Sequence, residues 1–337
     1  MHGPASPTRF PGTGARRRSY SSNTMKQFPS FRSLRRPIAA RGFASAILVA
    51  GALATAHHAV RAESGKLLLT GGVTSIDGAA GGGLTPWAVI GSNATQGQIG
   101  VAGTESVVST RNYTMKVQGL LLAIDDRVEA SIARQDFATG ATGRALGLPG
   151  LHLRMDVLGV KVRVLGDAVL DSDNLVPQVA VGVEVKDGSA GGLKPTLLAL
   201  GAHTNGIDYY ASATKLLLAQ SVLVNGTLRL TKANQNGLLG FGGTAQERYR
   251  LEPEFSLAWL AKRELAFGAE YRRKPDNLNP SVLGNGLKED DWWDLFAAWA
   301  PTKNFSLTAA YVQLGHIVPA VATRRQDGGY LSAQLAF

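Results

Sequence analysis

The sequence of 337 residues contains no cysteine. This absence excludes a lipoprotein anchor, thiol chemistry and cysteine-ligated metal sites. After residue 62 the chain also lacks an apolar stretch long enough for a membrane helix. Histidine is scarce there too, because only His152, His203 and His316 remain, without HxxxH or HExxH spacing. We therefore expect no metal site and no cofactor.

Acidic residues are missing from the first 62 positions, which hold ten of the 35 Lys and Arg residues. The formal net charge of +10 comes from this region, since the remaining chain has 25 basic and 25 acidic residues. A neutral mature chain gives no basis for nucleic-acid binding.

The amino-terminal 62 residues have the order of a secretory signal peptide. Four arginines between positions 32 and 41 precede the apolar run Gly42–Ala56, and Val60–Ala62 ends in a small residue. A basic flank, a short apolar core and a small residue at the cleavage position predict export, with cleavage near Ala62. A single membrane anchor is the alternative, although the run is short for a span. Residues 1–24, rich in Arg, Ser and Pro, leave open that Met25 is the true start.

The last ten residues, Gly328–Phe337, alternate between two kinds of side chain. Gly329, Leu331, Ala333, Leu335 and Phe337 form the outward set, with Tyr330, Ser332, Gln334 and Ala336 between them. Period two is typical of a strand with two different faces. A terminal Phe resembles the sorting signal of Gram-negative outer-membrane barrels, so Phe337 is the expected assembly signal.

About twelve such strands follow one another. They are expected near 97–108, 111–123, 127–137, 152–165, 176–187, 206–217, 221–231, 247–260, 264–274, 290–300, 304–316 and 328–337. A soluble sandwich would show the same alternation. Short turns alternate with long connections, however, as in transmembrane barrels. The fold class expected is all-β, with residues 97–337 forming a single antiparallel transmembrane β-barrel.

Residues 63–96 form a Gly-rich amino-terminal segment. Its glycines lack the spacing of a phosphate-binding or dinucleotide loop. A plug within the lumen or a rim segment suits residues 73–91, with Leu84 and Trp87 as anchors and Asp77 meeting a lumenal arginine. A first hairpin within the wall, giving fourteen strands, is the competing interpretation.

Alternation also assigns side chains to the two faces of the wall. The expected lumen lining is Arg248, Arg250, Glu252, Glu254 and Asp208. Trp259 and Trp299 lie forty positions apart in two similar hairpins, which indicates aromatic girdles at both membrane edges. The girdle residues expected are Trp259, Trp299, Tyr271, Tyr311, Trp292 and Trp293.

Three stretches carry a resemblance to a known family. They are GKLLLTGGV…GAAGGGLTPWAVIG (Gly65–Gly91), GIDYYASATKLL (Gly206–Leu217) and KEDDWWDLFAAWAPTKNFSLTAAYVQLGHI (Lys288–Ile317). The chain resembles the domain of unknown function 3034 family of proteobacterial exported proteins over essentially its whole mature length. The resemblance implies an outer-membrane barrel, but it implies no substrate and transfers no functional residue.

These features predict a channel or transporter for small solutes in the Gram-negative outer membrane. A non-conducting structural or envelope-biogenesis barrel is the alternative. A lipid-modifying barrel enzyme is less favoured because Ser306 and His316 lie roughly 27–33 Å apart on one strand, so no enzyme activity is expected. Expected partners are outer-membrane lipids, the barrel-assembly machinery and a small solute. Arg272, Arg273, Lys274, Arg324 and Arg325 are candidate contacts for lipopolysaccharide or an ordinary solvated rim.

Overall fold

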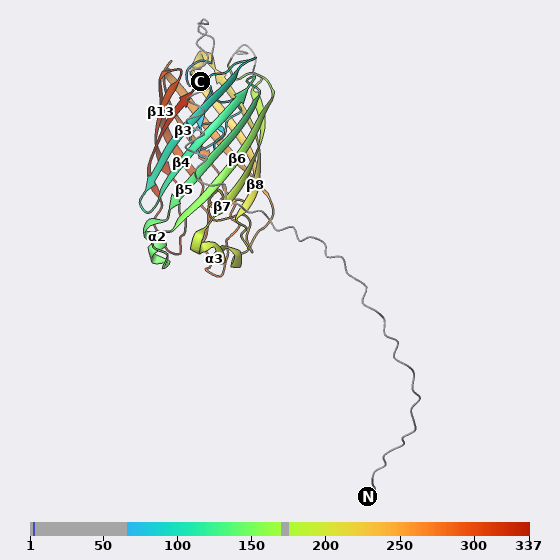
Figure 1. The fold of residues 1–337 in the computed structure, drawn as a ribbon, viewed down its shortest axis with the longest axis vertical. Helices are drawn as coiled ribbons and strands as arrows, with labels where there is room; N and C mark the ends of the chain where they lie inside the picture. Colours follow the sequence, from blue (N-terminus) through green and yellow to red (C-terminus); the bar gives the residue numbers. More distant parts are fainter. Residues whose placement is uncertain (1–2, 4–65, 170–174) are drawn as a thin grey trace, which may run out of the picture. The chain divides into compact units, whose positions relative to one another are not determined.

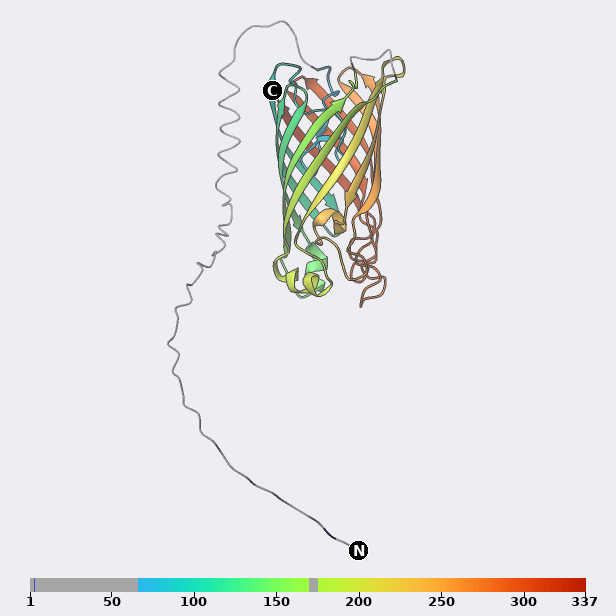
Figure 2. The ribbon, with the colours of Figure 1, turned by 90° about the vertical axis from the view of Figure 1, so that its right-hand side faces the viewer.

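The protein folds into one closed antiparallel β-barrel. The computed structural model describes Gly3 and residues 66–169 and 175–337, and both ranges belong to one compact unit. The predicted signal region and its cleavage near Ala62 lie outside the described residues. Twelve strands, β3 to β14, pair in sequence order around the barrel, and β14 returns to pair with β3 (Figures 1 and 2).

The strand bounds agree closely with the expected ranges. They are β3 Ile99–Thr110, β4 Thr114–Ile124, β5 Val128–Ala138, β6 His152–Leu165, β7 Gln178–Ser189, β8 Asn205–Leu217, β9 Val222–Thr231, β10 Arg250–Lys262, β11 Leu265–Arg272, β12 Trp292–Thr302, β13 Phe305–Gln313 and β14 Asp327–Ala336. The prediction of a twelve-stranded barrel is therefore confirmed. The fourteen-strand alternative is wrong, because β1 (Val73–Thr74) and β2 (Ala80–Gly81) pair with each other and with no strand of the wall.

Alternating side chains build the two faces of the wall. In β14, Tyr330, Ser332 and Gln334 are buried inside the barrel, whereas Leu331 and Leu335 are exposed outside. Phe337 extends this pairing, since its N–H donates to the Val101 carbonyl at 2.8 Å and its carbonyl accepts from the Val101 N–H at 3.0 Å. The carboxy-terminal residue thus helps to close the sheet against β3.

The two ends of the barrel differ in the length of their connections. The short-turn end holds Phe337, η2 (Leu218–Gln220) and tight turns such as Asp125–Asp126. Both aspartates have positive φ, 58° and 46°, as the type I′ turn Ile124–Arg127 requires, and the Arg127 N–H donates to the Ile124 carbonyl at 3.0 Å. The β6–β7 connection, residues 166–177, is longer and lies partly outside the described residues.

The long-loop end carries the irregular structure. It holds α2 (Gly140–Ala145), η1 (Gly191–Leu193) and α3 (Lys194–Ala199), and η3 (Asn234–Gly237) belongs to the β9–β10 loop (Figure 1). Among the described residues, no helix combines the length and the apolar character needed to cross a membrane.

Candidate functional site

The interior of the barrel contains a separate piece of chain. Every position from Val73 to Ser92 is buried, and this segment, called the inner segment below, runs inside the wall (Figure 2). Its start lies toward the short-turn end, where Gln334 accepts from the Thr74 N–H at 2.7 Å and from the Thr74 hydroxyl at 2.8 Å. Its tip reaches Ile76 and Leu84, which pack with the apolar cluster of the long-loop end.

Glycines permit this close fit. A Cβ on Gly82 would lie 2.1 Å from a Glu270 carboxylate oxygen, and one on Gly81 would lie 2.1 Å from the Thr85 carbonyl. The inner segment can therefore approach the wall at Gly82, and another part of its own backbone at Gly81, only because these positions have no side chain.

Glu270 on β11 holds the middle of the inner segment. Its carboxylate accepts from the Leu84 N–H at 2.7 Å and from the Thr85 N–H at 3.3 Å. The hydroxyls of Thr85 and Ser256 donate to the same carboxylate at 2.6 and 3.0 Å. Four donors on one buried carboxylate fix the segment's backbone to the wall, because each lost donor would leave charge unsolvated.

Glu129 and Lys161 form a second attachment. Glu129 accepts from the N–H groups of Ala80 at 2.9 Å and Gly91 at 2.8 Å. The Lys161 ammonium lies 3.1 Å from the Glu129 carboxylate and donates to the carbonyls of Ala80 and Trp87 at 2.9 and 3.2 Å. Both side chains are 1% exposed, so this ion pair has little contact with water.

Asp77, near the tip, joins a buried cluster of ions contributed by the wall. Its carboxylate lies 2.8 Å from Arg272, 3.4 Å from Lys186 and 3.8 Å from Arg229. The cluster, called the ion cluster below, consists of Asp77, Glu184, Lys186, Asp208, Arg229, Glu254 and Arg272, all 3% exposed or less. Four carboxylates therefore face three cations, and the wall cations have wall partners besides Asp77.

Loop β9–β10 folds inward to meet the inner segment. Residues 233–243 are all buried, and Gln235 and Asn236 adopt left-handed backbone, with φ of 45° and 60°. The Asn236 amide donates to Asp77 at 2.7 Å, and its oxygen accepts from Arg272 at 2.7 Å and Lys186 at 2.9 Å. This loop therefore binds the inner segment and the wall at the same point.

Another buried ion pair ties this loop to the neighbouring one. The Lys274 ammonium lies 2.9 Å from Glu289, and Glu289 accepts from the Gln235 N–H at 2.8 Å. Burial raises the pKa of Glu289 and lowers the pKa of Lys274. Both shifts weaken the charged forms, while the attraction between the two groups opposes them.

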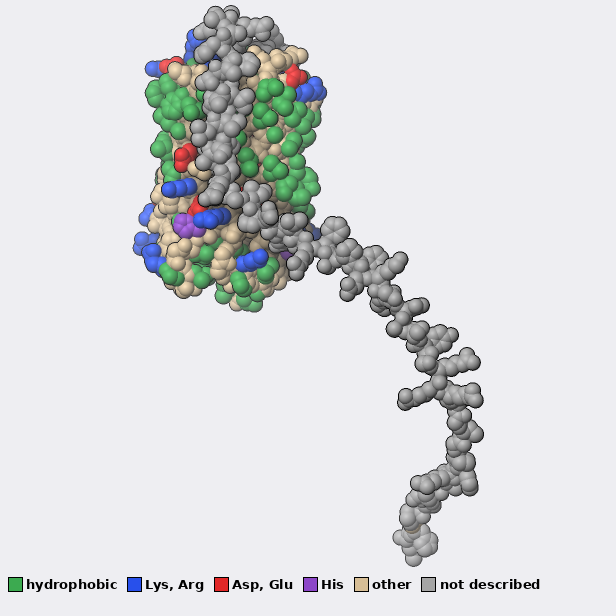
Figure 3. All heavy atoms as spheres, viewed as in Figure 1, with side chains coloured by type: hydrophobic (Ala, Val, Ile, Leu, Met, Phe, Trp, Pro, Cys, Tyr) green, Lys and Arg blue, Asp and Glu red, His purple; other side chains and the backbone are tan. Residues whose placement is uncertain are grey.

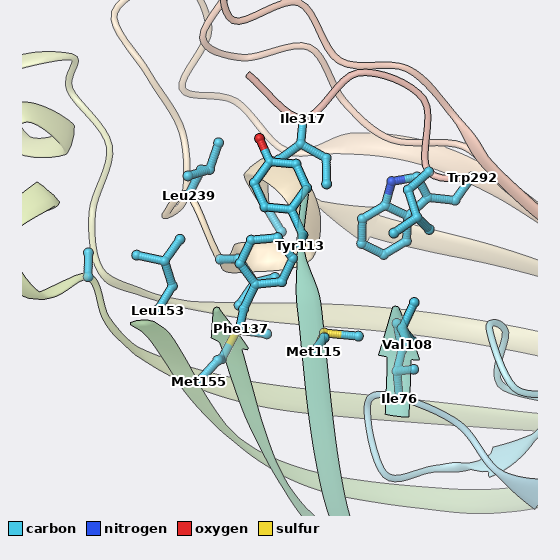
Figure 4. Packing of buried hydrophobic residues seen from close by; sticks show 14 of the residues in the cluster. Ile76, Val108, Tyr113, Met115, Phe137, Leu153, Met155, Leu239, Trp292 and Ile317 are labelled. Atoms are coloured by element: carbon cyan, nitrogen blue, oxygen red, sulfur yellow. The ribbon is translucent and has the colours of Figure 1, made fainter. Parts of the chain in front are cut away.

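An apolar cluster covers the long-loop end of the interior. Tyr113 stacks on Phe137 at 5.1 Å between ring centroids, and Met115, Trp292 and Ile317 surround them (Figure 4). A second cluster, which includes Trp87, Ile90, Leu121, Leu223 and Phe296, lies toward the short-turn end. The inner segment therefore contacts the ion cluster as well as the apolar clusters on either side of it.

The residues expected to line the lumen separate into two groups. Asp208 and Glu254 belong to the ion cluster, and Glu252 is buried 3.3 Å from Arg273. Arg248 and Arg250 are exposed, because they lie at or before the first residue of β10, beyond the enclosed part of the wall. The two arginines are therefore not part of the lining.

The residues expected in aromatic girdles fall at two levels. Trp259 and Trp299 are exposed near the short-turn end, and Trp259 stacks with Phe267 at 6.4 Å. Toward the long-loop end Trp293 and Tyr311 contact at 5.8 Å, and Tyr271 pairs with Trp293 across the strands. The prediction that Trp292 belongs to a girdle is wrong. Trp292 is 3% exposed and faces inward, since neighbouring residues of a strand point to opposite faces and Trp293 points outward.

Sequence reasoning missed most of the residues that hold the inner segment. Glu129, Lys161, Lys186 and Glu270 gave no motif, although each lies at an inward position of its strand. The rim assigned to lipopolysaccharide also needs correction: Arg272 and Lys274 are buried inside, while Arg273, Arg324 and Arg325 are exposed. The buried ions could have been recognised in the sequence as charged residues at inward-facing positions of the predicted strands.

Residues 70–334 match the family described as "Protein of unknown function (DUF3034)". The chain belongs to this family. The resemblance found in the sequence is thereby confirmed, and the family itself supplies no activity. No curated protein matches the chain.

Several solved outer-membrane barrels are similar to the chain. The KdgM porin shares 9% identity over 71% of this chain and 99% of its own, with a TM-score of 0.40. The NanC porin shares 7% identity over 71% and 99%, with a TM-score of 0.44. Outer membrane phospholipase A from Escherichia coli shares 8% identity over 71% and 92%, with a TM-score of 0.38. Likeness at this level carries no information on activity.

Proposed function

We propose that this DUF3034 protein is a channel for small solutes in the Gram-negative outer membrane, and that its inner segment keeps it closed. The exterior supports a membrane location, because Phe255, Leu257, Leu295 and Leu331 are all more than half exposed to the surroundings. In lipid, a spanning sheet must close so that every backbone group is paired. Signal-peptide cleavage near Ala62 and assembly through Phe337 belong to the same proposal.

One observation carries the proposal: the inner segment lies inside the barrel and is bound there by charged side chains of the wall as well as by apolar packing. A barrel of this size needs side chains, a plug or water inside. A core with no other role could rely on its apolar contacts alone, because replacing buried ion pairs by packed apolar residues is often neutral or stabilising. Glu129, Lys161, Glu270 and Arg272 would instead line a hydrated path once the segment left.

A non-conducting structural barrel is the second candidate. The burial of every residue in 73–92 and in 233–243 favours it, since both stretches occupy space inside the barrel. A lipid-modifying enzyme has less support. Ser306 is buried within the wall, whereas His316 lies in a loop and contacts Asp290 at 2.5 Å. The proposed partners are outer-membrane lipids including lipopolysaccharide, the assembly machinery and a small solute, with no nucleic acid.

Deleting residues 73–91 separates the two candidates. We expect the wild-type protein in planar bilayers to be closed for most of the recording, and the deleted protein to conduct steadily. Heat-modifiable gel mobility checks that the deleted barrel is folded. A folded deletion variant that conducts no more than the wild type would favour the structural barrel.

A further inference from the structure

The outer surface of the barrel is uneven in charge. The outward positions of β9 to β14 carry no charged residue between the strand ends of the described wall. On β3 to β7, by contrast, two rows of outward-facing polar residues cross the sheet. The first row is Glu105, Gln118, Arg134, Asp156 and Asp187, and the second is Lys116, Asp136 and Arg154, with His152 beside them. These residues are called the charged face below.

The charged face reaches deep into the region that lipid should cover. Glu105 lies near the middle of β3, Gln118 near the middle of β4 and Arg134 near the middle of β5. Figure 3 shows charged side chains extending up the front of the barrel from the long-loop end, between apolar ones. A charge on the lipid side costs about 2–4 kcal/mol for Arg or Lys at the midplane, and less for Asp or Glu. Contact of this surface with lipid alone would therefore be energetically unfavourable.

The charges nearly balance, and several are paired within the chain. Arg134 binds Asp156 through two contacts of 2.7 and 2.8 Å, and Asp136 accepts from Arg154 at 2.9 Å and contacts His152. In all, four carboxylates face three Lys and Arg side chains. The phosphates of lipopolysaccharide would require an excess of positive charge, which the charged face does not have.

The surface beside Glu105 is formed by small residues. The cross-strand neighbour of Glu105 on β14 is Ala333, and Gly103 and Gly329 face open space, with no atom within 4 Å of where a Cβ would stand. Small residues allow another rigid surface to approach closely.

We propose that the charged face is an interface with a second copy of this chain. If the two copies are related by a two-fold axis along the membrane normal, equivalent residues lie at the same depth in the membrane. The polar residues of one copy then face the polar residues of the other. Glu105 and Lys116 form no ion pair with other described residues of their own chain, and the second copy supplies opposite charges to both. Contact between copies also removes the ion pairs of Arg134 and Asp136 from lipid.

Thiol cross-linking tests this interface, because the natural chain has no cysteine. The variant Gln118→Cys places one thiol on the charged face without removing a charge. Leu257→Cys is the matched control, since Leu257 is exposed on β10, on the opposite side of the barrel. With a short bis-maleimide on intact outer membranes, we expect Gln118→Cys to give a band of twice the chain mass and Leu257→Cys to stay monomeric.

Mass spectrometry of the cross-linked band identifies what has been joined. A homodimer supports the proposal, whereas a band containing another protein overturns it. Equal yields from the two variants also overturn it, because they would report random collision. Val107→Cys, at the uncharged outward position that pairs with Lys116, serves if Gln118→Cys does not fold. The mass of the wild-type protein in lipid nanodiscs gives an independent result, and a monomer there contradicts the proposal.

Discussion

Replacing Asp77 by lysine should open the channel. Asp77→Lys brings a fourth cation against Lys186, Arg229 and Arg272, which already stand within 3.8 Å of the native carboxylate. Leaving a buried charge uncompensated costs about 3–5 kcal/mol. If that cost falls on docking of the inner segment, the released population rises roughly 10²–10⁴-fold.

The wall itself should survive this change. Lys186 keeps Asp208 at 2.9 Å, and Arg272 keeps Glu254 at 3.2 Å, so the wall cations retain their own partners. The conservative variant Asp77→Asn preserves most of the shape, and we expect it to stay much closer to the wild type. Open probability in planar bilayers measures both, with the exposed change Glu247→Lys as control. A folded Asp77→Lys protein that remains closed would show that the ion cluster does not hold the segment.

The second large effect is expected at Lys161. In Lys161→Met the buried carboxylate of Glu129 loses its only described cation partner, and the Ala80 and Trp87 carbonyls lose a donor. We expect a loss of about 3–5 kcal/mol in the free energy of unfolding. The double variant Lys161→Met/Glu129→Gln removes both charges and should lose less than the single variant. Urea unfolding in lipid measures these values, and strictly additive losses would contradict direct coupling of the two groups.

Much of the fold follows from local rules. Period-two alternation located all twelve strands, because each strand has one apolar and one enclosed face. The same rule shows why Trp292 was misplaced: two adjacent strand residues cannot both face lipid.

The contents of the lumen were only partly predictable. A buried charge at position 77 suggested an arginine partner, but Arg229 and Arg272 are far away in sequence and no spacing identifies them. The alternation of side chains predicted that Arg248 and Arg250 face inward, but they lie at or before the start of β10, where the wall no longer encloses an interior. The inward fold of residues 233–243 was missed, although Asn236 and Gly237 are residue types that tolerate the left-handed backbone found there.

Under the proposed function, a solute path exists only when the inner segment leaves the lumen. Ala88 tests this directly, because it is fully buried in the closed barrel. Its N–H donates to Thr214 and its carbonyl accepts from Gln178, both at 2.8 Å. The measurement is current through the Ala88→Cys variant in a planar bilayer while a water-soluble thiol reagent is added at the short-turn side. Gln96→Cys, exposed just beyond the inner segment, is the control that should react at once without changing the current.

We predict that Ala88→Cys reacts only during openings, and that each modified channel then stays open because the enlarged side chain cannot return. Channels that open and close normally while the thiol at position 88 remains unmodified would contradict the claim.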